Sequence, residues 1–430
     1  DWVSEGVSFV LWMHGVPAPD EAMQAQICRQ WEAMAKVQIQ TLGQFPQDEF
    51  HFILVGLPYA FYHGVEHRRC TVLALGPATE IWTHLYRELL GVASHELFHA
   101  WNVKSFRPKG MESYRYEGWM YSDLGYVYEG FTTYYGDLFL VRSGFLLPDE
   151  YLEEVNAYLL RHSENYGRYN HGLRESSIDT WVDGYSQSQS APHRRVSIYA
   201  EGMLQALHLD LVIRSSTMNN ESPASLDDLI RYLWKRFEQS PETPGYTQET
   251  LTLWLQENVS VPSTYKNWGD YFRIHYEQPN SIEESLRSIL PQFGCRLTTT
   301  PNEDRIKHLL GLQMKWNQAE PRVEHCVPGS PAALAGLGPD DRWLSWEIQT
   351  DSSEQSPAVL NPSSDADFLR KALTPADSLR VRWITALGHE RQGVLRTHST
   401  LRYYHHHKIE LDLQAGPNEL RARKQWLGIA

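Results

Sequence analysis

The sequence of 430 residues predicts an α+β protein in which a large, mainly helical part is followed by a smaller β domain. Three observations support this fold class. Residues 19–42 and several segments between 81 and 289 carry apolar side chains at helical spacing. The apolar run at 50–55, which ends at Gly56, predicts a buried strand. The polar, turn-rich stretch 295–304 then separates these segments from a region of different character.

Composition limits the class of protein further. The length predicts two or three domains, and 42% hydrophobic with 21% charged residues allows a sizeable core. A net charge of -14 argues against nucleic acid and against an anionic membrane surface as partners. We expect no membrane span, because no run of about eighteen apolar residues exists. No signal peptide is visible and no C-x-x-C pair occurs, so we expect a cytoplasmic protein without a disulfide framework.

The stretch that carries chemistry is ASHELFHAWNV at 93–103, which we expect at the end of a helix over 81–99. It contains an H-E-x-x-H motif formed by His95, Glu96 and His99. On a helix, His95 and His99 share one face and can reach the same metal ion. Glu96 lies about 100° further round the helix, close enough to hold a water molecule at that metal. Zinc suits this arrangement, because catalytic zinc usually takes three protein ligands and leaves a fourth position for water.

Glu129 is the candidate for the third ligand. It stands in the stretch YEGFTTYY, and a carboxylate from a second helix would complete a His-His-Glu site. The alternative is a solvated charge near a helix N-terminus, which is also favourable. That alternative does not explain the apolar neighbours, which fall on one side of a helix: Val127, Phe131, Tyr134, Tyr135 and Leu138.

The two motifs together resemble the glycyl aminopeptidase family, gluzincin metallopeptidases related to the aminopeptidase N group. The resemblance implies a thermolysin-like, mainly helical zinc peptidase domain over 19–300. It also implies a β-rich domain before it, of which 1–18 would be a remnant. The matching residues are His95, Glu96, Phe98, His99, Trp101, Asn102, Val103 and Lys104, then Asp123, Leu124, Val127, Glu129, Gly130, Phe131, Thr132, Tyr134 and Tyr135.

The same resemblance implies two substrate-binding residues, Glu66 and Gly64. Related aminopeptidases hold the free amino group of the substrate with a carboxylate on an edge strand, the role expected for Glu66 here. A carboxylate at this place makes charge-assisted bonds to an ammonium group. The alternative is that Glu66 pairs with a neighbouring arginine at the surface. The family pattern G-G-x-E-H-x-x-S-T is matched at Gly64, Glu66, His67 and Thr71, with departures at His63 and Cys70.

Tyr199 is the second catalytic candidate by resemblance. The stretch SIYAEGM is similar to the family pattern S-Y-Y-x-K-G-A, in which the second Tyr is thought to stabilise the tetrahedral intermediate. Glu201 replaces the usual Lys, and a core-packing tyrosine is the alternative reading of Tyr199. The Ser- and Tyr-rich stretch 165–189 before it has low apolar periodicity and predicts a long connection.

Residues 305–400 resemble a PDZ domain. Leu310–Met314 resembles its GLGF loop, and the run PGSPAALAGL with the following Asp340 and Asp341 matches its G-S-P-A-x-x-A-G-L-x-x-x-D pattern. PDZ domains bind C-terminal peptides at a sheet edge. The alternative here is a docking domain that binds no peptide ligand. Residues 401–430 are expected to form a strand and a charged helix.

These features together predict a zinc-dependent aminopeptidase acting on peptides with a free N-terminus. Glu96 would be the general base and Tyr199 the hydrogen-bond donor to the oxyanion. The resemblance implies a preference for small N-terminal residues such as Gly or Ala. Two alternatives remain open: an endopeptidase on the same zinc site, and a PDZ peptide-binding scaffold with a vestigial metal site. The intact set of site residues argues against the second.

Overall fold

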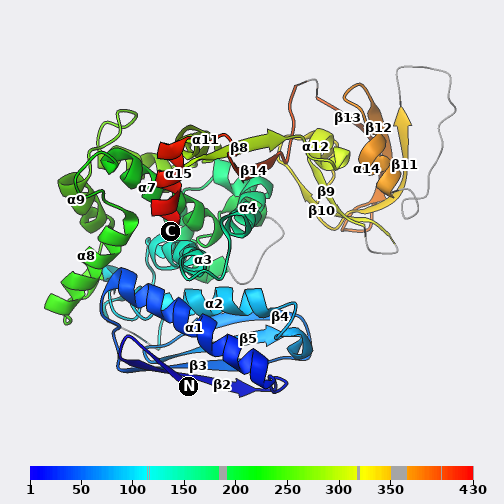
Figure 1. The fold of residues 1–430 in the computed structure, drawn as a ribbon. Helices are drawn as coiled ribbons and strands as arrows, with labels where there is room; N and C mark the ends of the chain where they lie inside the picture. Colours follow the sequence, from blue (N-terminus) through cyan, green and yellow to red (C-terminus); the bar gives the residue numbers. More distant parts are fainter. Residues whose placement is uncertain are drawn as a thin grey trace.

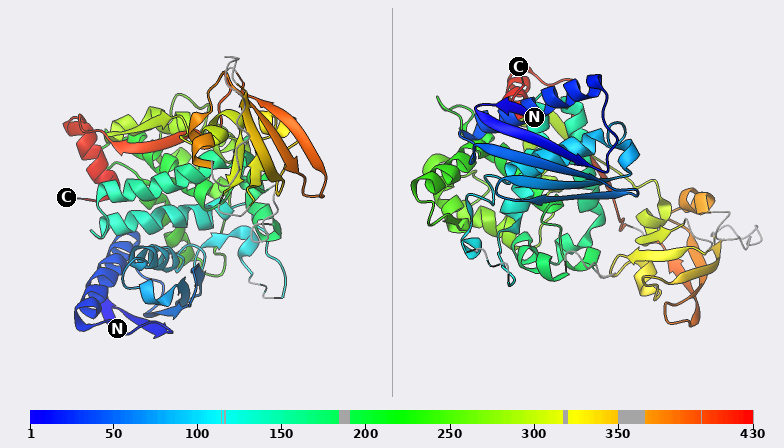
Figure 2. Two further views of the ribbon diagram at one scale, coloured as in Figure 1. Left: turned by 90° about the vertical axis from the view of Figure 1, so that its right-hand side faces the viewer. Right: turned by 90° about the horizontal axis from the view of Figure 1, so that it is seen from below.

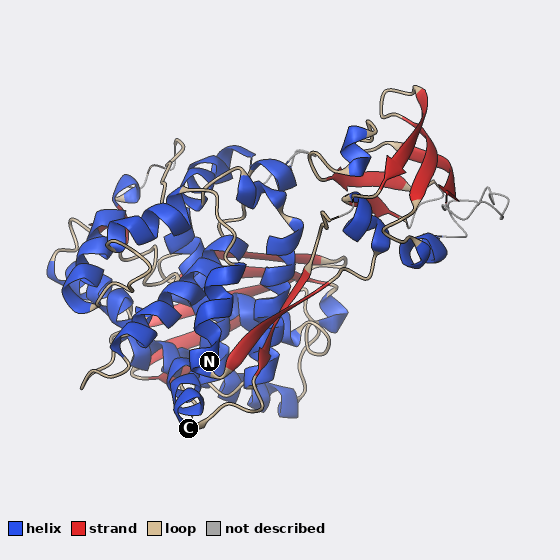
Figure 3. Ribbon diagram, turned by 90° about the horizontal axis from the view of Figure 1, so that it is seen from above, coloured by secondary structure: helices blue, strands red, loops and turns tan. Residues whose placement is uncertain are grey.

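The protein has a mixed α+β fold, as predicted, with a helical middle region between an N-terminal sheet and a C-terminal antiparallel sheet (Figures 1 and 3). The structure is a computed structural model. It describes residues 1–113, 115, 117–183, 191–316, 320–349, 366–398 and 400–429.

The N-terminal sheet has five strands in the order β1-β2-β3-β5-β4. β2, β3 and β5 are parallel, and β4 runs antiparallel to β5 at the edge of the sheet. Alternate side chains of β3 are buried in the core. Helices cover this face of the sheet (Figure 2). The strands are β1 (Trp2–Ser4), β2 (Val7–His14), β3 (Glu49–Gly56), β4 (Phe61–Glu66) and β5 (Cys70–Gly76).

Strands β1 and β2, which lie within the predicted remnant 1–18, belong to the same sheet as the strands that follow them. β2 pairs with β3 along its whole length, with Phe9 opposite Phe50. The Trp2 ring stacks on Phe9 and on Phe52, inside the same core that α1 (Glu21–Leu42) covers. The pairing is long-range, so the strand-like run gives no sign of its partner in the sequence.

Helices α1 and α2 (Tyr86–Phe98) lie over the buried face of this sheet, and further helices pack above them (Figure 1). The helix that carries the H-E-x-x-H motif begins later than the predicted 81–99, at Tyr86, because residues 81–85 form turns after the 3-10 turn η1 (Ala78–Glu80). The other helices of the middle region are η2 (Lys109–Met111), η3 (Tyr126–Phe131), α3 (Thr132–Arg142), α4 (Pro148–Glu164), η4 (Tyr166–Tyr169), α5 (Leu173–Asp183), α6 (Ala191–Arg194), α7 (Ala200–Thr217), α8 (Leu226–Gln239), α9 (Gln248–Asn258), α10 (Trp268–Phe272), η5 (Arg273–Glu277), α11 (Glu283–Ile289) and η6 (Leu290–Phe293), with a small strand pair β6 (Arg107–Pro108) and β7 (Gly245–Tyr246).

Helix α5 lies where a long connection was predicted, so that prediction was wrong for 173–183. Its buried face is polar rather than apolar, which is why apolar periodicity did not reveal it. Ser176 and Ser177 are fully buried. The Ser177 hydroxyl donates to the Leu173 carbonyl and the Thr180 hydroxyl to the Ser176 carbonyl, so the hydroxyls are satisfied within the helix.

The C-terminal sheet has its own hydrophobic core and the order β13-β12-β11-β10-β9, all antiparallel. The chain enters it along β8 and returns along β14, which pair with each other, and the last helix packs back on the middle region (Figure 1). Trp426 in that helix donates to the Tyr134 hydroxyl at 2.9 Å. The elements are β8 (Cys295–Thr300), α12 (Arg305–Leu310), β9 (Leu312–Lys315), β10 (Arg322–Cys326), α13 (Pro331–Leu334), β11 (Arg342–Gln349), α14 (Ala366–Ala372), β12 (Ser378–Ile384), β13 (Glu390–Arg396), β14 (His406–Leu411) and α15 (Pro417–Leu427).

Within the described ranges, none of the helices combines the length and the apolar character that crossing a membrane requires. The PDZ-like nature of the C-terminal sheet stays a prediction.

A buried histidine joins three helices of the middle region and makes stability depend on pH. His162 on α4 contacts Glu201 on α7 at 2.7 Å and Glu283 on α11 at 3.2 Å. Burial by itself lowers the pKa of His162, but the two carboxylates outweigh it and raise this pKa to about 9. Because the folded pKa lies above the ordinary value of 6.5, the stabilisation is complete below pH 6.5 and is lost as pH rises through about 9.

We therefore expect the free energy of unfolding to fall by roughly 2–3 kcal/mol as pH rises across this window. Denaturant unfolding at several pH values measures it. A His162→Gln variant should be less stable at low pH and should lack this part of the decline. An equal decline in both proteins would show that other groups cause it.

Candidate metal centre and active site

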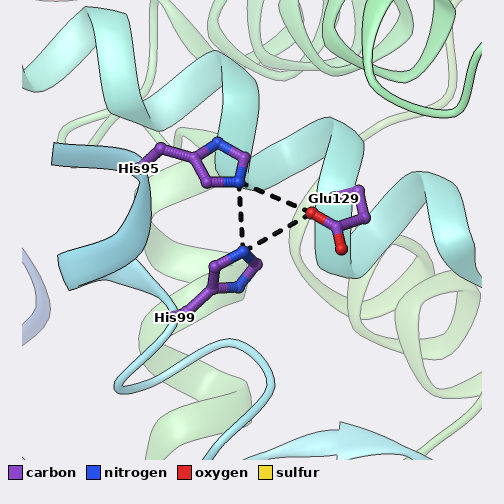
Figure 4. A group of neighbouring side chains, drawn as sticks. All are labelled: His95, His99 and Glu129. Atoms are coloured by element: carbon purple, nitrogen blue, oxygen red, sulfur yellow. Dashed lines mark hydrogen bonds and ion pairs between the residues drawn. The ribbon is translucent and has the colours of Figure 1, made fainter. Parts of the chain in front are cut away.

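Three predicted ligands meet at one point between α2 and η3 (Figure 4). The Nε2 atoms of His95 and His99 are 3.1 Å apart, and Glu129 Oε2 lies 3.5 Å from the first and 3.4 Å from the second. The side chains are 17%, 2% and 8% exposed, in that order, so His95 is the one that faces the solvent side. The three ligand atoms thus form a nearly equilateral triangle in a mostly buried position.

This triangle fits a zinc ion. Tetrahedral zinc with ligand bonds of about 2.0–2.1 Å places its donor atoms about 3.3 Å apart. The three observed separations lie close to that value. Two imidazoles and one carboxylate are also the donor set of catalytic zinc sites that leave a fourth position open. The residues present therefore suit the metal that the spacing predicted.

The ligand charges support one another. Burial raises the pKa of Glu129, but the two histidines outweigh it and lower this pKa to about 2. Burial lowers the pKa of His99, but the Glu129 carboxylate outweighs it and raises this pKa to about 9. For His95, burial dominates and its pKa is lowered. The ionised carboxylate of Glu129 is the state that a metal ligand needs, whereas His99 must lose its proton when a metal binds.

Asn102 orients one ligand, a role that the sequence did not reveal. His99 Nδ1 donates to the Asn102 carbonyl at 2.7 Å, which leaves Nε2 free to face the other ligands. The Asn102 amide donates in turn to the Val127 carbonyl and to Thr132, at the two ends of the segment that carries Glu129. Asn102 therefore ties the helix of the histidines to the helix of the glutamate.

Two facing glycines place Tyr199 beside the ligands. Gly130, next to Glu129, lies against Gly202 so closely that a Cβ atom on Gly130 would stand 2.5 Å from the Gly202 Cα. This close contact brings the start of α7 against η3 and sets Tyr199 near His95, with ring centroids 6.4 Å apart. The repeated E-G pair in the two motifs is the signal that could have indicated this contact.

Glu96 faces the edge strand β4. A Cβ atom built on Gly64 would meet Glu96 Oε1 at 2.1 Å, so the missing side chain of Gly64 makes the room that the Glu96 carboxylate occupies. The Thr71 hydroxyl lies 3.4 Å from the other carboxylate oxygen. Burial raises the pKa of Glu96 to about 8. A carboxylate with a raised pKa beside a metal site suits a general base.

Glu66 lies on the same face of β4, two residues beyond Gly64. Its carboxylate contacts the Lys104 ammonium at 3.1 Å, whereas the sequence suggested an arginine as its possible partner. Glu66, Glu96 and His99 also form a second group of potential metal-ligand atoms within 4.8 Å of one another. Glu66, the last residue of β4, thus lies beside the cluster of candidate ligands.

Adding a methyl group at Gly64 is expected to displace the Glu96 carboxylate without unfolding the protein. Gly64→Ala should lower kcat by about 10²-fold, the size typical of a misplaced reacting group. Gly338→Ala is the matched control, because a Cβ there meets nothing within 4 Å. Hydrolysis rates and melting temperatures of both variants test this. Full activity of Gly64→Ala would show that Glu96 needs no such room.

Comparisons with known proteins agree with this geometry. Residues 88–205 match the family model described as M61 glycyl aminopeptidase. The segment that holds the candidate metal site is thus similar to the M61 glycyl aminopeptidase family. This segment includes all three ligand candidates, Glu96 and Tyr199. The chain is therefore an enzyme of the metallopeptidase class, as predicted. No curated protein sequence matches the chain.

Among solved structures, an aminopeptidase N family protein from Idiomarina loihiensis superposes with a TM-score of 0.81 at 22% identity, over 99% of this chain and 70% of that one. The fold shared with this protein therefore covers nearly the whole chain. An M1 zinc metallopeptidase from Deinococcus radiodurans has a TM-score of 0.35 at 14% identity, over 57% of this chain and 43% of that one. Native yeast LTA4 hydrolase has a TM-score of 0.41 at 13% identity, over 66% of this chain and 41% of that one. TM-scores this low do not support a conclusion about the fold of this chain.

Proposed function

We propose that the protein is a zinc-dependent aminopeptidase that removes residues from the N-terminus of peptides. The observation that carries this proposal is the triangle of His95, His99 and Glu129. Beside it lie Glu96 of α2, which faces Gly64, and Glu66 of β4. Zinc in the triangle would supply Lewis-acid polarisation of the peptide carbonyl and a more acidic water.

The chain's own residues supply the remaining chemistry. Glu96 takes the proton from the attacking water and delivers it to the leaving amine. The Tyr199 hydroxyl donates a hydrogen bond to the oxygen that becomes negatively charged, a contribution of about 3 kcal/mol in comparable sites. Glu66 holds the free ammonium group of the substrate, in the place where it now holds Lys104. The ammonium group of the substrate must therefore displace the Lys104 ammonium from Glu66.

Hydrolysis of amino-acid p-nitroanilides tests the proposal. Glycyl and alanyl substrates should be cleaved, a chelator should stop the reaction, and zinc should restore it. The preference for small residues follows from the family resemblance, and comparison with leucyl and phenylalanyl substrates checks it. Cleavage of an N-acetylated peptide at a comparable rate would favour the endopeptidase instead. Zinc-loaded protein without any hydrolysis would favour the scaffold.

We also propose that the C-terminal sheet binds a peptide at strand β9. This strand follows the loop at Gly311, which has a positive φ of 62°, and it is an edge strand of the sheet. An edge strand offers backbone groups for an added strand. Calorimetry with peptides that end in a free carboxylate, compared with their amidated forms, tests this. Equal binding of both forms would contradict it.

A further inference from the structure

A second cavity opens on the far side of Gly64 from Glu66. It has a volume of about 290 Å³ and lies between β4, α2, α3 and α4. Its walls include Tyr62, Gly91, Leu140 and Tyr158, with Asp137 among the lining groups. The roles described above use none of these residues.

The strand β4 relates this cavity to the active site. Tyr62, Gly64 and Glu66 alternate along the strand and therefore share the face that meets Glu96. Successive residues on one face are about 7 Å apart. A substrate with its ammonium group at Glu66 and its cleaved bond beside Glu96 therefore extends toward Tyr62. Tyr62 is 59% exposed, so its ring stands at the mouth of the cavity.

Asp137 is an acidic residue of the cavity lining, half-buried as a whole. Its Oδ2 atom is buried and has no hydrogen-bond partner. Burial raises the pKa of Asp137 to about 7, helped by the nearby Glu154 carboxylate. A buried carboxylate oxygen without a hydrogen bond is costly, so a cation placed against it is favoured.

The two arginines of the lining, Arg87 and Arg161, lower the pKa of Asp137 but do not outweigh burial and the Glu154 carboxylate. Arg87 contacts Glu154 at 2.7 Å, and its guanidinium also donates to the Glu150 carbonyl. Glu88 and Arg161 are exposed at the rim, where water screens their charges. The lining thus carries three carboxylates against two guanidinium groups.

We propose that this cavity is a specificity subsite for a lysine or arginine side chain in the leaving part of the peptide. The inference rests on the proposed peptidase function. The aliphatic part of such a side chain packs against Leu140, Leu146 and the two tyrosine rings, and its cationic end meets Asp137. The basic residue is the first or second after the cleaved bond.

Peptides that differ only in one side chain test the subsite. Gly-Lys-Ala and Gly-Ala-Lys are compared with the same peptides carrying norleucine, which keeps the length and removes the charge. We expect kcat/KM to favour lysine by about tenfold or more at one of the two positions. Equal values at both positions would overturn the proposal.

Three variants assign the preference to the cavity. Asp137→Asn should remove it while leaving the norleucine peptides within about twofold. Glu88→Gln, at the rim, should keep most of it. Gly91→Leu should fill the cavity, because a Cβ on Gly91 meets nothing within 4 Å, and should slow both long side chains but not Gly-Gly-Gly. A lysine preference that survives Asp137→Asn would overturn the proposal.

Binding separates failure of the subsite from failure of the peptidase. Calorimetry with the zinc-loaded protein measures the affinity for Gly-Lys-Ala and its norleucine counterpart without requiring hydrolysis. Tighter lysine binding that Asp137→Asn abolishes, in a protein that cleaves nothing, would sustain the subsite and reject the peptidase. Equal binding in a protein that cleaves both peptides would reject the subsite and sustain the peptidase.

Discussion

Replacing Glu96 with Gln is expected to lower kcat for glycyl and alanyl substrates by about 10²–10⁴-fold, the usual contribution of a positioned general base. Gln fills the same space beside Gly64 but cannot take a proton from water. The Thr71 hydroxyl and the room at Gly64 hold the side chain in one place, so the variant should change chemistry rather than position. Steady-state hydrolysis by wild type and Glu96→Gln measures the effect.

The zinc content of the two proteins is the control for this experiment. Glu96→Gln should bind zinc as the wild type does, because Glu96 is absent from the triangle of His95, His99 and Glu129. KM should change little if substrate binding is intact. A variant that keeps more than about a tenth of the wild-type kcat would assign the proton transfer to another group.

Replacing Glu129 with Gln is expected to weaken zinc binding by more than the 10- to 100-fold typical of an outer-shell substitution. The change removes an anionic ligand that contacts both histidines at 3.4–3.5 Å. Zinc affinity is measured by competition with a chromogenic chelator. Activity should fall in parallel and should recover in part at high zinc concentration.

Glu66→Gln is the matched comparison for Glu129→Gln. The structure offers a second possible group of metal-ligand atoms, in which Glu66 and Glu96 join His99. If the triangle holds the metal, Glu66→Gln should keep its zinc affinity and should mainly raise KM for substrates with a free amino group. Loss of zinc from Glu66→Gln with retention in Glu129→Gln would assign the metal to the second group.

Local spacing predicted the candidate ligand cluster that the structure brings together. His95 and His99 lie one helical turn apart, and helix geometry places such a pair together whatever surrounds them. Glu129 could be predicted as a ligand candidate because its apolar neighbours follow a helical period. Backbone periodicity within one helix needs no knowledge of partners, so both helices and the ligand candidates that they carry could be predicted from the sequence. The α+β class followed from the same kind of evidence.

Contacts between distant segments were decided only by the tertiary structure. The pairing of β2 with β3, the room that Gly64 leaves for Glu96, and the ion pair of Glu66 with Lys104 each join residues far apart in the chain. Helix α5 escaped prediction because its buried hydroxyls are satisfied by its own carbonyls rather than by apolar packing.

The surroundings of Asp137 could not be predicted from the sequence. It stands in the sequence as one of many acidic residues on a helix, where a solvated charge is the ordinary reading. Only the packing of α3 against α2, α4 and β4 buries its carboxylate beside a cavity and leaves one oxygen without a partner. Burial and pairing are properties of the assembled fold, and a pattern of residue types along one segment does not contain them.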